Sequence, residues 1–154
     1  MKLTNLSTKL LAGYQVLGGL IGITSTINEI LSSPDRLFGL LGLLYVIAIF
    51  LFSFSIYSGY KLINSEERGI YYSRINQSLQ LIIFAILGYG YSFASGLKFV
   101  IGIDTTSETR IFYKYSLSTW RFMIGSDNDS SYLGINVVAL ILLIFIEVRY
   151  KKLI

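Results

Sequence analysis

The chain has 154 residues, of which 53% are hydrophobic and only 14% are charged, and its mean hydropathy is +0.62. This composition excludes an ordinary soluble domain and predicts one integral membrane domain, because each crossing of a hydrocarbon core about 30 Å thick takes roughly 20 helical residues. Neither cysteine nor histidine is present, which excludes disulfide exchange, thiolate catalysis and the usual zinc and haem sites. The net charge of +4 comes from basic residues beside apolar stretches, so we expect contacts with membrane lipids and none with nucleic acid.

The first apolar stretch predicts a transmembrane helix over about residues 10–31. A cleaved signal peptide is the less favoured alternative, because the stretch continues without a clear small-residue cleavage site. Gln15, Gly18 and Gly22 fall on one face of this helix, and the two glycines have the G-x-x-x-G spacing that lets another backbone approach closely. We interpret this face as an intramolecular packing surface, with a dimer contact as the alternative.

The second predicted transmembrane helix covers about residues 36–63. Residues 32–35 before it contain serine, proline and aspartate and predict a compact turn, which would make the first two helices antiparallel neighbours. The second half of this stretch alternates hydroxyl and aromatic residues, as a strand would. We predict a helix nonetheless, because an isolated strand cannot satisfy its backbone hydrogen bonds in lipid.

The third predicted helix, about residues 74–102, is the stretch around which we expect the protein to be organised. Small and polar residues recur along it at spacings of three or four, which places them on one helical stripe at about 100° per residue. The opposite side is aliphatic and aromatic, so one side would face protein or water and the other lipid. The residues of this stripe to which we assign helix packing or pore lining are Gln77, Gln80, Gly88, Tyr91 and Ser95.

Residues 104–131 form the longest predicted segment outside the membrane and are assigned to an extracytoplasmic loop. As a helix, the segment would place Arg110, Lys114 and Arg121 on one side. The sole tryptophan, Trp120, would lie on the other side as an interfacial anchor. We therefore predict an amphipathic helix in the headgroup region. A β-hairpin is the alternative, because apolar and polar residues also alternate along the middle of the segment.

The fourth predicted helix covers about residues 132–149, with Asn136 as a polar group on its stripe. Residues 127–129 resemble the start of a calcium loop, but the glycine and glutamate positions of an EF-hand are missing, so we expect no metal site. The predicted fold is thus an all-α integral membrane protein, with four transmembrane helices in an antiparallel up-down bundle.

Four crossings place both termini on one side of the membrane. With this topology, eight basic residues fall on the side of the termini and five on the other, which favours cytoplasmic termini. The expected location is the bacterial cytoplasmic membrane.

The chemistry available to this chain is limited. Within the predicted spans the candidates for acid–base or nucleophilic chemistry are Glu29, Lys98 and Glu147, all near helix ends, so we predict no catalytic residues, cofactor or metal. The deep polar groups are neutral amides and hydroxyls, which can join helices within one chain, form an oligomer seam or line a pore.

We therefore expect a non-enzymatic assembly, scaffold or sensor subunit that acts through the polar stripe of residues 74–102. Its expected partner is a second copy or another membrane protein. The alternative is an oligomeric channel or carrier for a small solute, lined by Gln77, Gln80, Tyr91 and Ser95.

Overall fold

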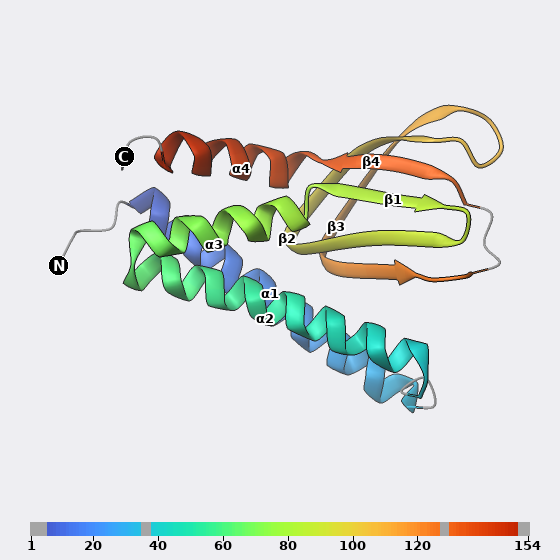
Figure 1. Ribbon diagram of the computed structural model, residues 1–154, viewed down its shortest axis with the longest axis horizontal. Coiled ribbons are helices and arrows are strands. Elements are labelled where there is room, and N and C mark those ends of the chain that lie inside the picture. Colours follow the sequence, from blue (N-terminus) through green and yellow to red (C-terminus); the bar gives the residue numbers. More distant parts are fainter. Residues whose placement is uncertain (1–5, 35–37, 127–129, 151–154) are drawn as a thin grey trace.

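The computed structural model describes residues 6–34, 38–126 and 130–150 and combines helices with an antiparallel sheet (Figure 1). In chain order the elements are α1 (Leu6–Ser32), α2 (Leu40–Asn64), α3 (Glu66–Leu79), β1 (Ile82–Ile86), β2 (Tyr89–Asp104), β3 (Arg110–Met123), β4 (Tyr132–Asn136) and α4 (Val137–Tyr150). The prediction of an all-α four-helix bundle is therefore wrong. Within the described residues, two helices, α1 and α2, are long and apolar enough to cross a membrane.

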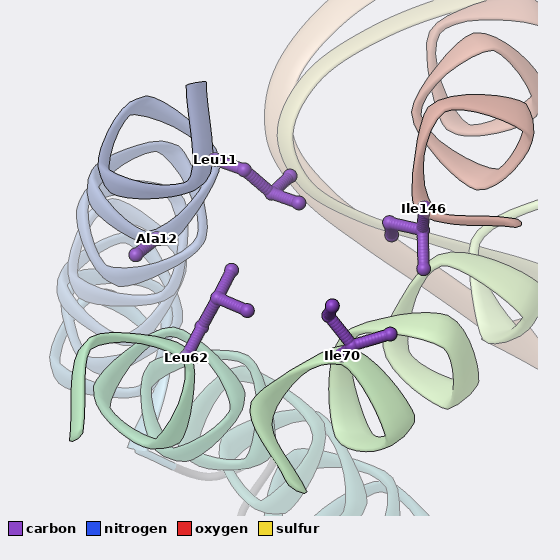
Figure 2. Packing of buried hydrophobic residues seen from close by; sticks show 5 residues of the cluster. All are labelled: Leu11, Ala12, Leu62, Ile70 and Ile146. Atoms are coloured by element: carbon purple, nitrogen blue, oxygen red, sulfur yellow. The ribbon is translucent and has the colours of Figure 1, made fainter. Parts of the chain in front are cut away.

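The helices α1 and α2 pack against each other as an antiparallel hairpin (Figure 1). Glycines allow the close approach: a Cβ atom on Gly19 would lie 2.6 Å from Ile56 Cγ1, and one on Gly59 would lie 2.6 Å from the Ala12 carbonyl oxygen. At one end of this hairpin the shorter helices α3 and α4 join it. Figure 2 shows the apolar cluster at this end, to which all four helices contribute: Leu11, Ala12, Leu62, Ile70 and Ile146.

The third predicted helix is wrong beyond Leu79, where α3 ends and the chain becomes extended. Glycine is unfavourable inside a helix by about 1 kcal/mol, and this stretch contains several. Leu87 and Gly88 have positive φ values of 52° and 77°, as the two central residues of a type I′ hairpin turn require. They connect β1 to β2, and Ile86 pairs directly with Tyr89 across the turn.

The interfacial helix predicted within residues 104–131 is also wrong, and the β-hairpin alternative is the one observed. Arg110–Met123 forms β3, which pairs with β2 along its whole length. The alternation of apolar and polar residues decides the outcome, because it places one kind on each face of a strand. The predicted fourth helix likewise begins late, since residues 132–136 form β4 between β1 and β2, and α4 starts at Val137.

The hairpin of β2 and β3 folds back on itself (Figure 1). Side chains from both parts of the folded hairpin line a pocket. The register shifts between Ala94 and Leu97, and Gly96 and Ser118 have φ values of 104° and 37° at the fold. We call Ser95, Gly96 and Ser118 the apex. The helix-side arm comprises residues 89–94 and 119–123, and the outer arm comprises residues 97–104 and 110–117.

The two short strands connect the arms on one side. β1 pairs with the start of the helix-side arm, β4 pairs with the end of the outer arm, and β1 and β4 pair with each other. The strand order β1-β4-β2-β3 therefore curls into a partial barrel, closed on the β1–β4 side. On the other side lies β3, whose second edge pairs with no strand in the described part of the chain.

Candidate functional site: a cationic pocket between the arms

A pocket of about 380 Å³ lies between the inward faces of the two arms. Inward and outward residues alternate along β2 and β3, and the register shift at the apex keeps the inward faces of both arms turned toward each other. The polar residues that line the pocket are Ser92, Lys98, Asp104, Lys114, Ser116, Thr119 and Arg121. Phe112, Trp120 and Tyr132 supply aromatic walls.

Lys98 is the most enclosed charge of the pocket, with 6% of its surface exposed. Its Nζ donates a hydrogen bond to Ser92 Oγ at 2.9 Å, and within the described residues no carboxylate forms an ion pair with it. Burial, followed by the positive charges of Lys114 and Arg121, lowers the pKa of Lys98 to about 8. Lys114 and Arg121 themselves line the pocket from its exposed side.

The one acidic residue that lines the pocket, Asp104, is already engaged. Its Oδ1 accepts a hydrogen bond from the Thr106 backbone N–H at 2.9 Å, and its Oδ2 lies 3.1 Å from Nη2 of Arg110. Hydrogen bonds from Thr106, followed by the contact with Arg110, hold the pKa of this carboxyl below its ordinary value. The pocket thus contains three positively charged side chains, those of Lys98, Lys114 and Arg121. Its carboxylate, Asp104, pairs with Arg110 and with none of these three.

A buried hydroxyl completes the set of polar groups. Ser116 pairs with Lys98 across the strands, so both side chains share the inward face, and Ser116 Oγ is buried without a hydrogen-bond partner among the described residues. Such a group loses its hydration without compensation unless something in the pocket bonds to it. The arrangement of two lysines, an arginine and a free hydroxyl is suited to binding an anion.

No protein-family model, curated protein or solved structure matches this chain. Within the described residues, no group of three or more acidic side chains comes together that could hold a metal ion. The calcium-like residues 127–129 lie outside the described part of the chain. The function has to be inferred from the pocket and from the elements that hold it.

The predicted stripe of residues 74–102 is distributed over different elements. Gln77 lies on α3 and Gln80 is the residue that caps its C-terminus, Gly88 lies in the turn between β1 and β2, and Tyr91 and Ser95 lie on β2. The tyrosine hydroxyl of Tyr91 donates to the Leu79 carbonyl at 2.6 Å, and its ring stacks on those of Phe84 and Phe122. The side-chain amide of Gln77 is buried and has no hydrogen-bond partner among the described residues.

Gln80 and Ser95 meet in a buried hydrogen-bond network between the apex and the helices. Gln80 Oε1 accepts from the Ser95 backbone N–H at 2.8 Å, and Ser95 Oγ is 2.8 Å from Ser55 Oγ on α2. Asn76 donates to the same Ser55 hydroxyl, which in turn donates to the Gln15 carbonyl on α1. These side chains therefore form hydrogen bonds with backbone and side-chain groups of the same chain. They do so at the apex, where the backbone hydrogen bonds between β2 and β3 are interrupted.

The glycine face of α1 also packs within the chain. A Cβ atom on Gly18 would lie 2.5 Å from the Gly96 backbone nitrogen, and the Gly18 carbonyl accepts a hydrogen bond from Ser118 Oγ at 2.8 Å. A side chain on Gly22 would collide with the ring of Phe52. The apex thus rests on the middle of α1. Elsewhere, Asn136 Oδ1 accepts from the Phe99 backbone N–H at 3.3 Å, at the junction of β4 and α4.

Sequence reasoning selected Lys114 and Arg121 but placed them on a helix facing the headgroup region. Trp120, predicted as an interfacial anchor, lines the pocket and donates from Nε1 to Thr26 Oγ1 on α1 at 3.1 Å. The prediction missed Lys98 as a pocket residue. The signal that could have revealed it is the two-residue alternation from Leu97 to Ile103, which leaves Lys98 on the opposite face from its apolar neighbours.

Proposed function

We propose that this protein is a small, non-enzymatic membrane protein that binds an oxyanion, such as a phosphate group, in the pocket between the arms. The observation that carries the proposal is the convergence of Lys98, Lys114 and Arg121 without a free carboxylate. Like charges held together in a partly dry site repel one another, and a bound anion reverses that repulsion. The polar groups of the pocket bind and orient an anion, and the carboxylate that could act as a base is held by Arg110.

The membrane location is supported by α1 and α2, which are long and apolar enough to cross a bilayer. We propose that they do so in a bacterial cytoplasmic membrane, with the end formed by α3 and α4 on the cytoplasmic side. Lys9, Lys61 and Arg68 lie at that end, as the excess of basic residues in cytoplasmic segments would require. The helix-side arm runs from Gly18 toward Thr26, so in this orientation the pocket belongs to the outer half of the protein.

The tryptophan of the pocket provides a direct test, because it is the only one in the chain. Titration of the detergent-solubilised protein with inorganic phosphate should change Trp120 fluorescence in a saturable way. Replacing Lys114 or Arg121 with methionine should weaken binding about tenfold, since a charge-assisted hydrogen bond contributes roughly 1.5–3 kcal/mol. Lys61→Met, at the far end of α2, is the matched control and should leave the titration unchanged.

Two results would refute the proposed function. The first is a fluorescence signal that does not saturate, and the second is equal affinity in the wild type and in both pocket variants. Circular dichroism and thermal unfolding of each variant separate loss of binding from loss of structure.

The channel alternative lacks comparable support. Gln80, Tyr91 and Ser95 form hydrogen bonds inside the chain, and Gln77 is buried, so these residues do not share a lumen. Assembly with a second copy or with another membrane protein stays a prediction. The mass of the detergent-solubilised protein would test whether it forms a homo-oligomer.

A further inference from the structure

The outer arm carries its apolar residues on the outside, opposite to the pocket. Cross-strand pairing places four pairs of large side chains on this convex face: Leu97–Leu117, Phe99–Tyr115, Ile101–Tyr113 and Ile103–Ile111. All eight side chains are between 38% and 82% exposed. Leu133 and Ile135 of β4, which pair with Ile103 and Ile101, continue the same exposed face.

This pattern is the reverse of that in a sheet with one face in water. Antiparallel sheets in water bury their apolar face and expose their polar one, whereas here the charges point inward and the aliphatic and aromatic groups point outward. The medium that favours the observed arrangement is apolar. The exposed leucines and isoleucines along α1 and α2 adjoin the same medium, since both helices are of membrane-crossing length and α1 packs against the helix-side arm.

The polar interior and the apolar exterior meet along the free edge of β3. Lys114 and Ser116 point inward from this strand, while Tyr113 and Tyr115, which alternate with them, point outward. Because no strand of the described chain covers this edge, a molecule can have one part in the pocket and another part on the convex face, separated by a single strand.

We infer that the anion is the phosphate-bearing headgroup of an anionic membrane lipid whose acyl chains lie over the outward face of β3. This inference rests on the proposed function and adds the class of ligand. A pocket of about 380 Å³ admits a headgroup and leaves the acyl chains outside, where Ile111, Tyr113 and Tyr115 are exposed. A free phosphate would use the cations alone and would leave the convex face without a role.

The charge of the pocket specifies the headgroup further. Lys98, Lys114 and Arg121 face one carboxylate that is already paired with Arg110, so the lining has an excess of positive charge. A zwitterionic headgroup would bring its ammonium group into this field, which repels it. We therefore expect phosphatidylglycerol or phosphatidic acid to bind and phosphatidylcholine to be rejected.

Quenching of Trp120 by lipids with brominated acyl chains measures this preference. The full chain in mixed micelles should show saturable quenching by brominated phosphatidylglycerol, at an affinity about tenfold higher than for brominated phosphatidylcholine. Tyr113→Ser and Ile111→Ser, at positions 76% and 79% exposed, should weaken lipid binding several-fold without changing the titration with inorganic phosphate. Ile135→Ser, on the same face but two strands from the edge, is the matched control.

The outcomes separate the two proposals. If inorganic phosphate binds with the expected dependence on Lys114 and Arg121 but both lipids quench equally, the lipid inference is wrong and the anion site stands. If the serine variants on β3 bind phosphatidylglycerol as well as the wild type does, the acyl chains do not lie there and the inference also fails. If neither phosphate nor phosphatidylglycerol binds, the proposed function itself is wrong.

Discussion

The helical end and the sheet end of this protein orient their apolar side chains in opposite ways. At the helical end, Leu11, Leu62, Ile70 and Ile146 turn inward and form an apolar cluster. At the sheet end, the outer arm turns its apolar side chains outward and encloses lysine, arginine and serine. The elements that stabilise the fold and the proposed binding site are therefore separated in space: the helices and the apex hold the fold, and the arms hold charges that oppose one another.

The largest loss of stability should come from Phe52, at the contact between the two regions. Its ring is fully buried and lies 5.1 Å, centroid to centroid, from that of Phe93 on the helix-side arm. Phe52→Ala should lower the free energy of unfolding by about 4 kcal/mol, because it removes a buried aromatic ring and leaves a cavity. Phe50→Ala, on the same helix but 68% exposed, should change it little. Denaturant unfolding in detergent, followed by circular dichroism, measures both, and similar losses would mean that the arm does not rest on α2.

A smaller loss is expected where the apex rests on α1. Gly18→Ala places a methyl group against the backbone of Ser95 and Gly96, neither of which can move without opening the apex. We expect the free energy of unfolding to fall by about 2 kcal/mol, as it does at other overpacked sites. Gly13→Ala has open space around its Cβ and should stabilise the same helix by about 0.5–1 kcal/mol through helix propensity. Denaturant unfolding of both variants should therefore show changes of opposite sign in the free energy of unfolding. Changes of the same sign would contradict the contact between the apex and α1.

Lys98 should oppose folding instead of supporting it. Its pKa in the folded protein is about 8, below the ordinary value of 10.5, because burial disfavours the charged form. The destabilising effect is therefore present in full below pH 8 and is lost as the pH rises from 8 to 10.5. Lys98→Met should raise the free energy of unfolding by about 1 kcal/mol at pH 7 and by less at pH 10. Thermal unfolding at the two pH values checks this, and a variant less stable at pH 7 would contradict it.

The smallest effect is the pH dependence of anion binding. Sulfate keeps its charge between pH 6 and 9, so its affinity reports on the protein alone. Binding should weaken as the pH rises through about 8, because Lys98 loses its proton there. Lys114, Arg121, Asp104 and Tyr132 are the other ionisable groups that line the same pocket. Trp120 fluorescence titrations across this range should show a decline of a few-fold in the wild type and a nearly flat profile in Lys98→Met.

The helical region was the more predictable of the two because its signals are local. Length and composition predict the helices around residues 10–31 and 36–63, and the four-residue spacing of Ser73 and Gln77 is a true helical pattern up to Leu79. Beyond that residue the spacing of Gly88, Tyr91 and Ser95 continues by coincidence. The turn at Leu87 and Gly88 interrupts it, but leucine is not a typical residue for a positive φ, so the sequence gives little warning.

The pocket could not be predicted from sequence because it depends on pairing between distant segments. The three- and four-residue spacing of polar residues favoured a helix for the segment that forms β2, and its partner β3 was assigned separately to the headgroup region. The apex is less predictable still: Ser118 adopts a positive φ where its hydroxyl bonds to both Gly96 and Gly18, and that contact exists only once α1 is in place. Local alternation indicates strands but contains no information about where a hairpin folds back.

The hydroxyl of Ser118 joins three parts of the molecule, since it accepts from the Gly96 backbone N–H and donates to the Gly18 carbonyl. The angle between the two arms is consequently tied to the helix beneath the apex. A thinner or thicker bilayer changes the tilt of a crossing helix. Under the proposed crossing of the membrane by α1, a change in the tilt of this helix would act on the arms through the Ser118 hydroxyl.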